Sequence, residues 1–316
     1  MEQNTIAIVW DFDKTLIKGY MQDPIFKKFS VDATAFWKEV NSLPEEYRKQ
    51  GVKVNTDTIY LNHMLTCVGQ GIFKGLNNDI LTELGQELEF YNGIPDIFRI
   101  LKEAIASDPS FSKFGIHVEH YIVSTGITAM IRGSKISKYV DGIWGCEFIE
   151  EPIISSLEIK IANEPKSTEK EIQQVGYIID NTSKTRAVFE INKGVNKFDY
   201  IDVNGRIDPE NRRVPFEHMI YVADGPSDVP VFSVLQQYGG RTFAIYPKGD
   251  TKAFNQVDQL RKDGRIDMYA EADYSEESMA CMWLLEQTKA IAQVIYANHD
   301  EEIRKSASIP PKHLST

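Results

Sequence analysis

Apolar positions along this chain follow two different periods. Residues 6–10 form an uninterrupted apolar run, which indicates a strand buried on both faces, and the run ends at Asp11. Beyond residue 20 the apolar side chains recur at helical spacing instead, as in Tyr60, Met64 and Cys67. This second pattern predicts helices over residues 23–29, 32–50, 55–70 and 77–90.

From residue 92 onward, strand and helix patterns alternate. A helical segment after residue 95 leads to a β-branched strand over 117–125, a short helix from residue 128 and a strand over 141–150. The pattern then predicts a helix over 182–191 and strand–helix pairs up to residue 297. Such alternation favours an α/β fold with a parallel sheet, in which the chemistry lies beyond the carboxyl ends of the strands.

Two stretches interrupt this alternation and a third follows it. Residues 152–180 are expected to form a small β-ribbon, and residues 194–217 an irregular surface loop. The tail of residues 299–316 contains two consecutive prolines and is expected to be disordered. The expected division is therefore an α/β core of residues 1–18 and 92–298, with a helical block of residues 19–91 inserted in it.

Charge and cysteine content restrict the class of protein. The net charge is −11 over 316 residues, which argues against a general affinity for nucleic acid or anionic membranes but leaves room for a small phosphate-bearing ligand. Cys67, Cys146 and Cys281 show no metal-binding spacing, so we expect reduced core thiols. No apolar run of about 18 residues and no signal peptide is visible, so we expect a cytoplasmic protein.

Polar groups gather at three predicted strand ends. Asp11 and Asp13 stand two residues apart, so they would lie on one side of a continuing strand and repel each other. A divalent cation such as Mg²⁺ would neutralise them, whereas an isolated pair could equally belong to a solvated turn. The other two groups are the triplet of residues 124–126 (STG) and the pair Asp224 and Asp228. Their convergence at one sheet edge favours a catalytic site over coincidence.

Together these motifs resemble those of the haloacid dehalogenase (HAD) superfamily, specifically its phosphoserine-phosphatase-like phosphatases. The D-x-D-x-T motif after a hydrophobic strand is matched by DFDKT at 11–15, and the strand-ending serine by Ser124 in YIVSTG. The acidic motif is matched by DGPSD at 224–228. The resemblance implies a Rossmann-like core with a parallel sheet and, over residues 19–91, an inserted helical cap that closes over the site.

The resemblance also implies roles for individual residues. Asp11 would attack phosphorus and form an aspartyl-phosphate, and Asp13 would act as general acid and base. Phosphate oxygens would be held by Ser124, Thr125, Gly126 and a lysine. That lysine is expected to be Lys184, with Lys193 at the far end of the same helix as the alternative.

The implied metal is Mg²⁺. Its ligands would be Asp11, Asp224 and the main-chain carbonyl of Asp13, while Asp228 would orient a metal-bound water. On the cap side, Tyr20 and Gln22 are close enough to the first motif to face the substrate. Phosphoserine-specific members carry a glutamate where Tyr20 stands here, which argues against phosphoserine as the substrate.

The expected function is Mg²⁺-dependent hydrolysis of a small phosphorylated metabolite through an aspartyl-phosphate. Two alternatives keep all of these motifs: a phosphomutase or phosphotransferase, and a protein that binds a phosphate ligand without catalysis. A true dehalogenase is disfavoured, because it needs no general acid at position 13. The sequence identifies neither the individual substrate nor the oligomeric state.

Overall fold

The computed structural model describes residues 3–153 and 170–307. Within these residues seven strands form one sheet, in the order β4-β3-β2-β1-β5-β6-β7. The strands are β1 (Thr5–Trp10), β2 (His117–Ile127), β3 (Gly142–Ile149), β4 (Gln174–Tyr177), β5 (Met219–Ala223), β6 (Arg241–Tyr246) and β7 (Met268–Glu271). All neighbouring strands are parallel except β3 and β4, which are antiparallel.

The strand order reverses direction once, beside β1. The chain passes from β1 outward through β2 and β3, then returns to β5 on the other side of β1 and continues to β6 and β7. In open α/β sheets the crevice at such a reversal, beyond the carboxyl ends of the strands, is where ligands bind. The residues that follow β1 and β5 therefore occupy the position where this fold carries chemistry.

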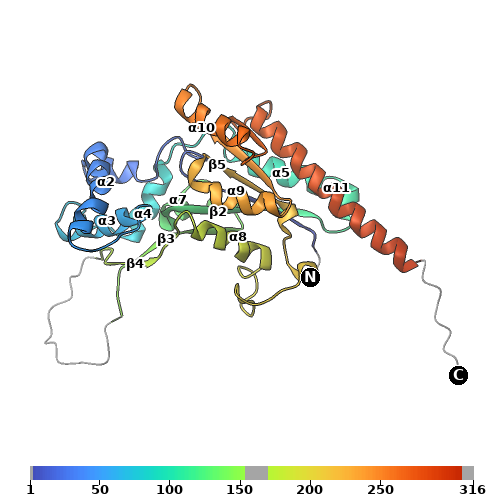
Figure 1. Cartoon of the computed structure of the whole chain (residues 1–316), viewed down its shortest axis with the longest axis horizontal. Helices are drawn as coiled ribbons and strands as arrows, with labels where there is room; N and C mark the ends of the chain where they lie inside the picture. The colour runs from blue at the N-terminus through green and yellow to red at the C-terminus, as the bar shows by residue number, and fades with distance from the viewer. Residues whose placement is uncertain (1–2, 154–169, 308–316) are drawn as a thin grey trace.

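Helices surround the sheet and form a separate group at one end of the molecule (Figure 1). The group is α1 (Asp23–Lys28), α2 (Ala33–Lys49), α3 (Ile59–Gly69) and α4 (Asn78–Leu84). The remaining helices are α5 (Asp96–Ala106), α6 (Pro109–Ser112), α7 (Thr128–Gly133), α8 (Ser183–Lys193), α9 (Val229–Gln237), α10 (Thr251–Lys262) and α11 (Met279–Ala307). None of the described helices is long and apolar enough to cross a membrane.

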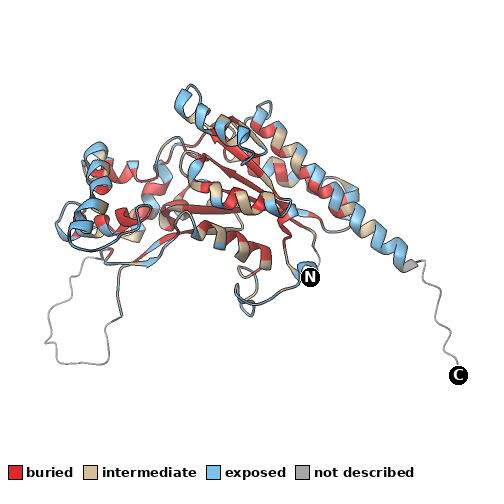
Figure 2. Cartoon of the chain, viewed as in Figure 1, coloured by how far each residue is buried: buried red, intermediate tan, exposed pale blue. Residues whose placement is uncertain are grey.

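The core lies between the sheet and the helices that pack on it (Figure 2). Every residue of β1 is buried, and the ring of Trp10 meets Phe98 and Tyr274 edge to face at 5.4 and 5.8 Å between centroids. Helices α5 and α11 pack against each other, as do α8 and α9. Because β1 is covered on both faces, its sequence needs no polar alternation, which explains the uninterrupted apolar run.

The structure confirms the α/β class with an inserted helical cap and changes two of the local expectations. The strand expected over 117–125 extends to Ile127, with a register shift against β3 after Val123. Only the second strand of the expected ribbon can be compared, as β4, because residues 154–169 lie outside the described part of the chain. The tail was expected to begin at residue 299, but α11 runs to Ala307. Ion pairs four residues apart, Asp300 with Arg304 and Glu301 with Lys305, support its last turns.

The segment 194–217 is anchored to the sheet by a buried ion pair. The Arg213 guanidinium donates to both oxygens of Glu119 on β2, at 2.6 and 2.7 Å, and the Tyr121 hydroxyl also donates to this carboxylate. Burial alone would raise the pKa of Glu119, but hydrogen bonds from His117, Arg213 and Tyr121 outweigh it and hold the pKa below its ordinary value of 4.5. An irregular segment thus gains one fixed attachment point.

We expect Arg213→Met to lower the free energy of unfolding by roughly 1–3 kcal/mol, because the Glu119 carboxylate would lose two hydrogen bonds and keep only Tyr121, His117 and Lys197 beside it. Urea unfolding at pH 7 measures this. The double variant Glu119→Leu, Arg213→Met should recover most of the loss, since both charges of this pair are then absent.

The same carboxylate also makes stability depend on pH. Because the pKa of Glu119 is lowered on folding, its contribution is complete above 4.5 and is lost as the pH falls through the folded value. A Glu119→Gln variant should therefore show a flatter acid limb of stability against pH. An unchanged acid limb would contradict this role of Glu119.

Candidate active site

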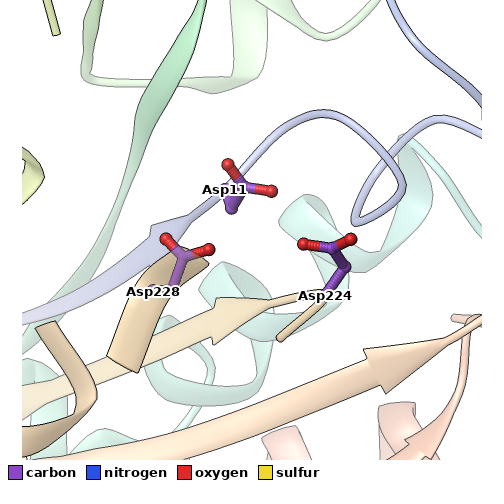
Figure 3. A group of neighbouring side chains, drawn as sticks. All are labelled: Asp11, Asp224 and Asp228. Atoms are coloured by element: carbon purple, nitrogen blue, oxygen red, sulfur yellow. The ribbon is translucent and has the colours of Figure 1, made fainter. Parts of the chain in front are cut away.

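Three carboxylates meet at the carboxyl edge of the sheet (Figure 3). Asp11 follows β1 directly, and its N–H donates to Val222 O of β5 at 2.8 Å, so it is held as if the strand continued. Asp224 follows β5, and Asp228 lies one turn further on. Each offers an oxygen, and these oxygens all lie within 4.8 Å of one another. The strand reversal therefore brings together groups that are more than 200 residues apart in sequence.

Lys184 lies inside this cluster. It belongs to the first turn of α8, is fully buried, and donates from Nζ to Asp11 Oδ1 and to Asp228 Oδ1, both at 2.7 Å. Burial alone would lower the pKa of Lys184, but the two carboxylates outweigh it and raise the pKa above 10.5. The lysine is therefore a permanent cation.

The alternative lysine lies elsewhere. Lys193 Nζ donates to the carbonyls of Val203 and Gly205, at 2.5 and 2.7 Å, at the other end of α8. Its contacts hold the segment 194–217 in place. Of the two lysines left open by the sequence, the structure places only Lys184 beside Asp11.

Asp228 is held more firmly than the sequence suggested. It is fully buried, and in addition to Lys184 its carboxylate accepts from Tyr221 Oη at 2.6 Å and from Ser227 Oγ at 2.8 Å. Three donors fix both oxygens of this carboxylate. Tyr221 was not foreseen, because within the apolar run of β5 its ring looks like ordinary core.

The loop after β1 orients the Asp11 carboxylate. Thr15 Oγ1 donates to Asp11 Oδ2 at 2.9 Å, and the Thr15 carbonyl in turn accepts from the buried Tyr274 hydroxyl at 2.7 Å. Lys14 adopts a left-handed backbone conformation, with φ of 56°, which turns the chain back sharply. Asp11 therefore has one fixed rotamer, with Lys184 at one oxygen and Thr15 at the other.

Asp13 is held by the main chain rather than by a cation. Its Oδ1 accepts from the Met21 N–H at 2.9 Å. Burial, and after it the charge of Asp11, raise the pKa of Asp13 well above its ordinary value. Burial also raises the pKa of Asp11, but Lys184 opposes that shift. The two aspartates of the motif thus lie in different electrostatic environments.

The triplet Ser124–Thr125–Gly126 forms the register shift in β2 rather than a simple strand end. Ser124 is buried, and its Oγ accepts from the Gly126 N–H at 3.0 Å. A Cβ on residue 126 would lie 2.1 Å from Met21 Cε, so a larger residue would have to displace the buried Met21 side chain. Met21 Sδ also accepts from the Ile127 N–H at 2.9 Å. Met21 therefore connects the loop of Asp13 to the loop of Ser124, which no sequence pattern indicated.

Residues of the helical cap contact the core at several places, two of them through α3 and the segment before it. Tyr60 of α3 donates from Oη to the Thr125 carbonyl at 2.8 Å, and Asn55 Nδ2 donates to Asp180 Oδ2 at 2.9 Å. Of the expected cap residues, Gln22 is buried, while Tyr20 is 42% exposed and accepts from Lys14 Nζ at 2.6 Å. Gln22 thus lies deep within the cap and Tyr20 at its outer edge.

The charge of the cluster fits a divalent cation. Asp11, Asp224 and Asp228 oppose the single ammonium of Lys184, which leaves two negative charges uncompensated when all three are ionised. Burial, followed by the charges of Asp11 and Asp228, raises the pKa of Asp224 to about 7. Carboxylate oxygens are the ligands that Mg²⁺ prefers, and such an ion would remove this repulsion. The donor set therefore fits the expected metal.

Comparison with known proteins gives one close relative and several structural neighbours. No family model matches the chain. The sequence is 37% identical over 289 residues to an uncharacterised protein from Borreliella burgdorferi, covering 90% of this chain and 97% of that one. Among solved structures, a HAD-family hydrolase from Salmonella enterica serovar Typhi aligns with a TM-score of 0.52 at 13% identity, over 90% of this chain and 72% of that chain.

A phosphoserine phosphatase with an analogue of its phospho-aspartyl intermediate aligns with a TM-score of 0.47 at 16% identity, over 84% of this chain and 93% of that chain. The sequence relative extends over nearly the whole length of both proteins, and the alignment with the Salmonella hydrolase shows a likeness of fold. The chain therefore belongs to one family with the Borreliella burgdorferi protein, and its fold is that of the haloacid dehalogenase superfamily, as its motifs predicted.

Proposed function

We propose that this protein is a Mg²⁺-dependent phosphomonoester hydrolase that acts through an aspartyl-phosphate on Asp11. The observation that supports this best is the setting of the Asp11 carboxylate. It lies at the strand reversal, between Lys184 and Thr15, and faces Asp224. A nucleophilic carboxylate has to be ionised, fixed in one rotamer and close to positive charge, and this setting meets all three needs.

Asp11 would attack phosphorus while the bond to the leaving alcohol breaks. Lys184 would neutralise the carboxylate and the incoming phosphate, since its charge is permanent. Asp228, fixed by Tyr221 and Ser227, would hold Lys184 in position. Positioning and charge neutralisation account for most of the catalysis in phosphoryl transfer, which suits a site of rigidly held charges.

Asp13 would serve the proton transfers. Its raised pKa favours the protonated form, in which it can give a proton to the departing alkoxide. Once deprotonated, it can take a proton from the water that hydrolyses the aspartyl-phosphate. The Met21 N–H holds this side chain apart from the Lys184 cluster, so one aspartate can act as nucleophile while the other acts as acid.

Ser124 and the main-chain N–H groups around Gly126 would hold the phosphate oxygens, with Thr125 contributing its backbone. Asp11, Asp224 and the main-chain carbonyl of Asp13 would hold Mg²⁺. When bound, that ion supplies positive charge to the phosphate and to the carboxylate cluster. The buried position of Ser124 and the close approach that glycine permits at 126 support this assignment.

The wider organisation belongs to the same proposal. Residues 19–91 would act as a mobile cap over a core of residues 1–18 and 92–298, excluding water and selecting the substrate. The substrate would be a small phosphorylated metabolite. We also place the protein in the cytoplasm, because its three cysteines are unpaired and buried, which suits a reducing compartment.

We expect Asp11→Asn to lower turnover of p-nitrophenyl phosphate by roughly 10⁴- to 10⁶-fold, the scale of removing a nucleophile. The variant should stay folded, because the amide oxygen can still accept from Lys184 while its N–H₂ donates to the Thr15 hydroxyl. Steady-state assay with Mg²⁺ and a thermal unfolding curve measure the two effects. If Asp11→Asn kept full turnover, Asp11 could not be the nucleophile.

We expect Asp13→Asn to lower turnover of alkyl phosphates by about 10²- to 10⁴-fold, the contribution of a positioned proton donor. The loss in the bond-breaking step should be smaller with p-nitrophenyl phosphate, because nitrophenolate leaves without a proton. The second step still needs a base, so phosphoenzyme should accumulate with that substrate. Acid quench and intact-protein mass spectrometry detect it. Loss of Mg²⁺ binding without trapped phosphoenzyme would instead make the Asp13 side chain a metal ligand.

Removal of divalent ions with a chelator should abolish turnover, and added Mg²⁺ should restore it. Asp228→Asn should raise the Mg²⁺ concentration for half-maximal activity by about 10- to 100-fold, as expected for a group that positions the ligands. Asp224→Asn should raise it further, because a direct ligand is lost. Titration of activity with Mg²⁺ compares the variants. Equal Mg²⁺ requirements in wild type and Asp224→Asn would contradict the ligand set.

A further inference from the structure

A buried acceptor without a partner lies beside the proposed general acid. Gln22 is only 3% exposed, and its Oε1 has no hydrogen-bond partner among the described residues. The preceding residue, Met21, donates its N–H to Asp13. Gln22 is therefore the residue directly after the one that holds Asp13. Buried polar groups are rarely left unpaired in folded proteins, so this one needs an explanation.

The neighbouring hydroxyl fixes which way the Gln22 amide points. Tyr60 gives its only proton to the Thr125 carbonyl at 2.8 Å, so its oxygen can only accept a further hydrogen bond. The Gln22 side chain interacts with this hydroxyl, and it must therefore present its N–H₂ group there. Its carbonyl oxygen then points away from Tyr60 and remains an acceptor.

The rings of Tyr60, Trp37 and Tyr20 lie side by side, and we refer to these three rings as the aromatic wall. The ring of Trp37 lies 5.7 Å from that of Tyr60 and 5.9 Å from that of Tyr20, between centroids. The Nε1–H of Trp37 is buried and also has no partner among the described residues. On its outer edge the wall meets Lys14, whose ammonium already donates to the Tyr20 hydroxyl at 2.6 Å. The wall thus combines apolar ring surface with one free acceptor and one free donor.

The chemistry of these two atoms distinguishes classes of leaving group. An ammonium can only donate and a carboxylate can only accept, whereas a hydroxyl does both. A purely alkyl group would leave both protein atoms unpaired in a buried site, which is costly. Aromatic faces suit the C–H surface of a small uncharged molecule.

We propose that the cap selects phosphate esters of uncharged polyhydroxy alcohols, with Gln22 Oε1 and Trp37 Nε1 as the specificity-determining atoms. Hydroxyl groups of the alcohol donate to Gln22 and accept from Trp37, and its carbon skeleton packs on Trp37 and Tyr60. Because this assignment rests on the proposed phosphatase function, its test has to separate a failure of selectivity from a failure of catalysis.

The test compares kcat/KM for four esters of similar size, with p-nitrophenyl phosphate as the reference for catalysis. Glycerol 3-phosphate carries two hydroxyls, propyl phosphate none, phosphoethanolamine an ammonium, and O-phosphoserine an ammonium and a carboxylate. We expect glycerol 3-phosphate to exceed propyl phosphate by about 10²-fold or more, because unpaired buried groups penalise the analogue. The two charged esters should also fall below glycerol 3-phosphate, because an ammonium or a carboxylate would lose its hydration in this buried site and meet no opposite charge on Gln22 or Trp37.

Two variants locate the effect. Gln22→Met should lower kcat/KM for glycerol 3-phosphate by about 10- to 100-fold and affect propyl phosphate less. The ratio of the two kcat/KM values should therefore fall towards one. Trp37→Phe should shift the ratio in the same direction while keeping an aromatic ring. Lys38→Ala, an exposed change on the same helix α2, should leave the ratio unchanged.

A stability measurement separates binding from a structural role. Gln22→Met removes the hydrogen bond to Tyr60 together with a buried oxygen that has no partner among the described residues, so its urea midpoint should stay close to that of wild type. Equal kcat/KM for glycerol 3-phosphate and propyl phosphate, or preference for a charged ester, would overturn the proposal while leaving phosphatase function intact. Absence of turnover on all five esters would overturn the phosphatase function, and this proposal with it.

Discussion

The contact on which the site depends is the buried ammonium of Lys184 between two aspartates. Asp11 and Asp228 come from different strand ends and would repel each other at this distance without it. Removing the cation would leave buried carboxylates uncompensated, which costs far more than an exposed ion pair contributes. The ends of β1, α8 and the turn after β5 are thus fixed relative to one another by charge as well as by the sheet.

Much of this architecture could be predicted from the sequence, because β1 and β5 are covered on both faces and their apolar runs are long. The two aspartates after β1 and the pair after β5 were visible because charged residues rarely follow such runs without a reason. Lys184 could not be separated from Lys193 by pattern alone. Both lie on α8, and only the three-dimensional course of residues 194–217 shows that Lys193 holds that segment.

Other features were hidden for identifiable reasons. Tyr221 and Met21 look like core residues, and both are core residues, but each also contacts the site through one polar atom. The end of α11 was mistaken for a tail because the segment has a low apolar content, whereas its turns are supported by ion pairs four residues apart. Apolar periodicity indicates which residues are buried. It therefore does not show that a core residue such as Tyr221 also has a polar role, and it does not detect the exposed end of α11.

The hydrogen bond from Tyr60 to the Thr125 carbonyl bears on how substrate enters the proposed site and how product leaves it. It joins residues 19–91 to the loop proposed to hold phosphate, beside the contacts of Asn55 with Asp180 and of Met21 with Ile127. Each such bond contributes only about 1 kcal/mol. In the cap motion proposed above, such bonds would break each time the cap opens, and solvent viscosity would slow the entry of substrate and the exit of product by slowing that motion.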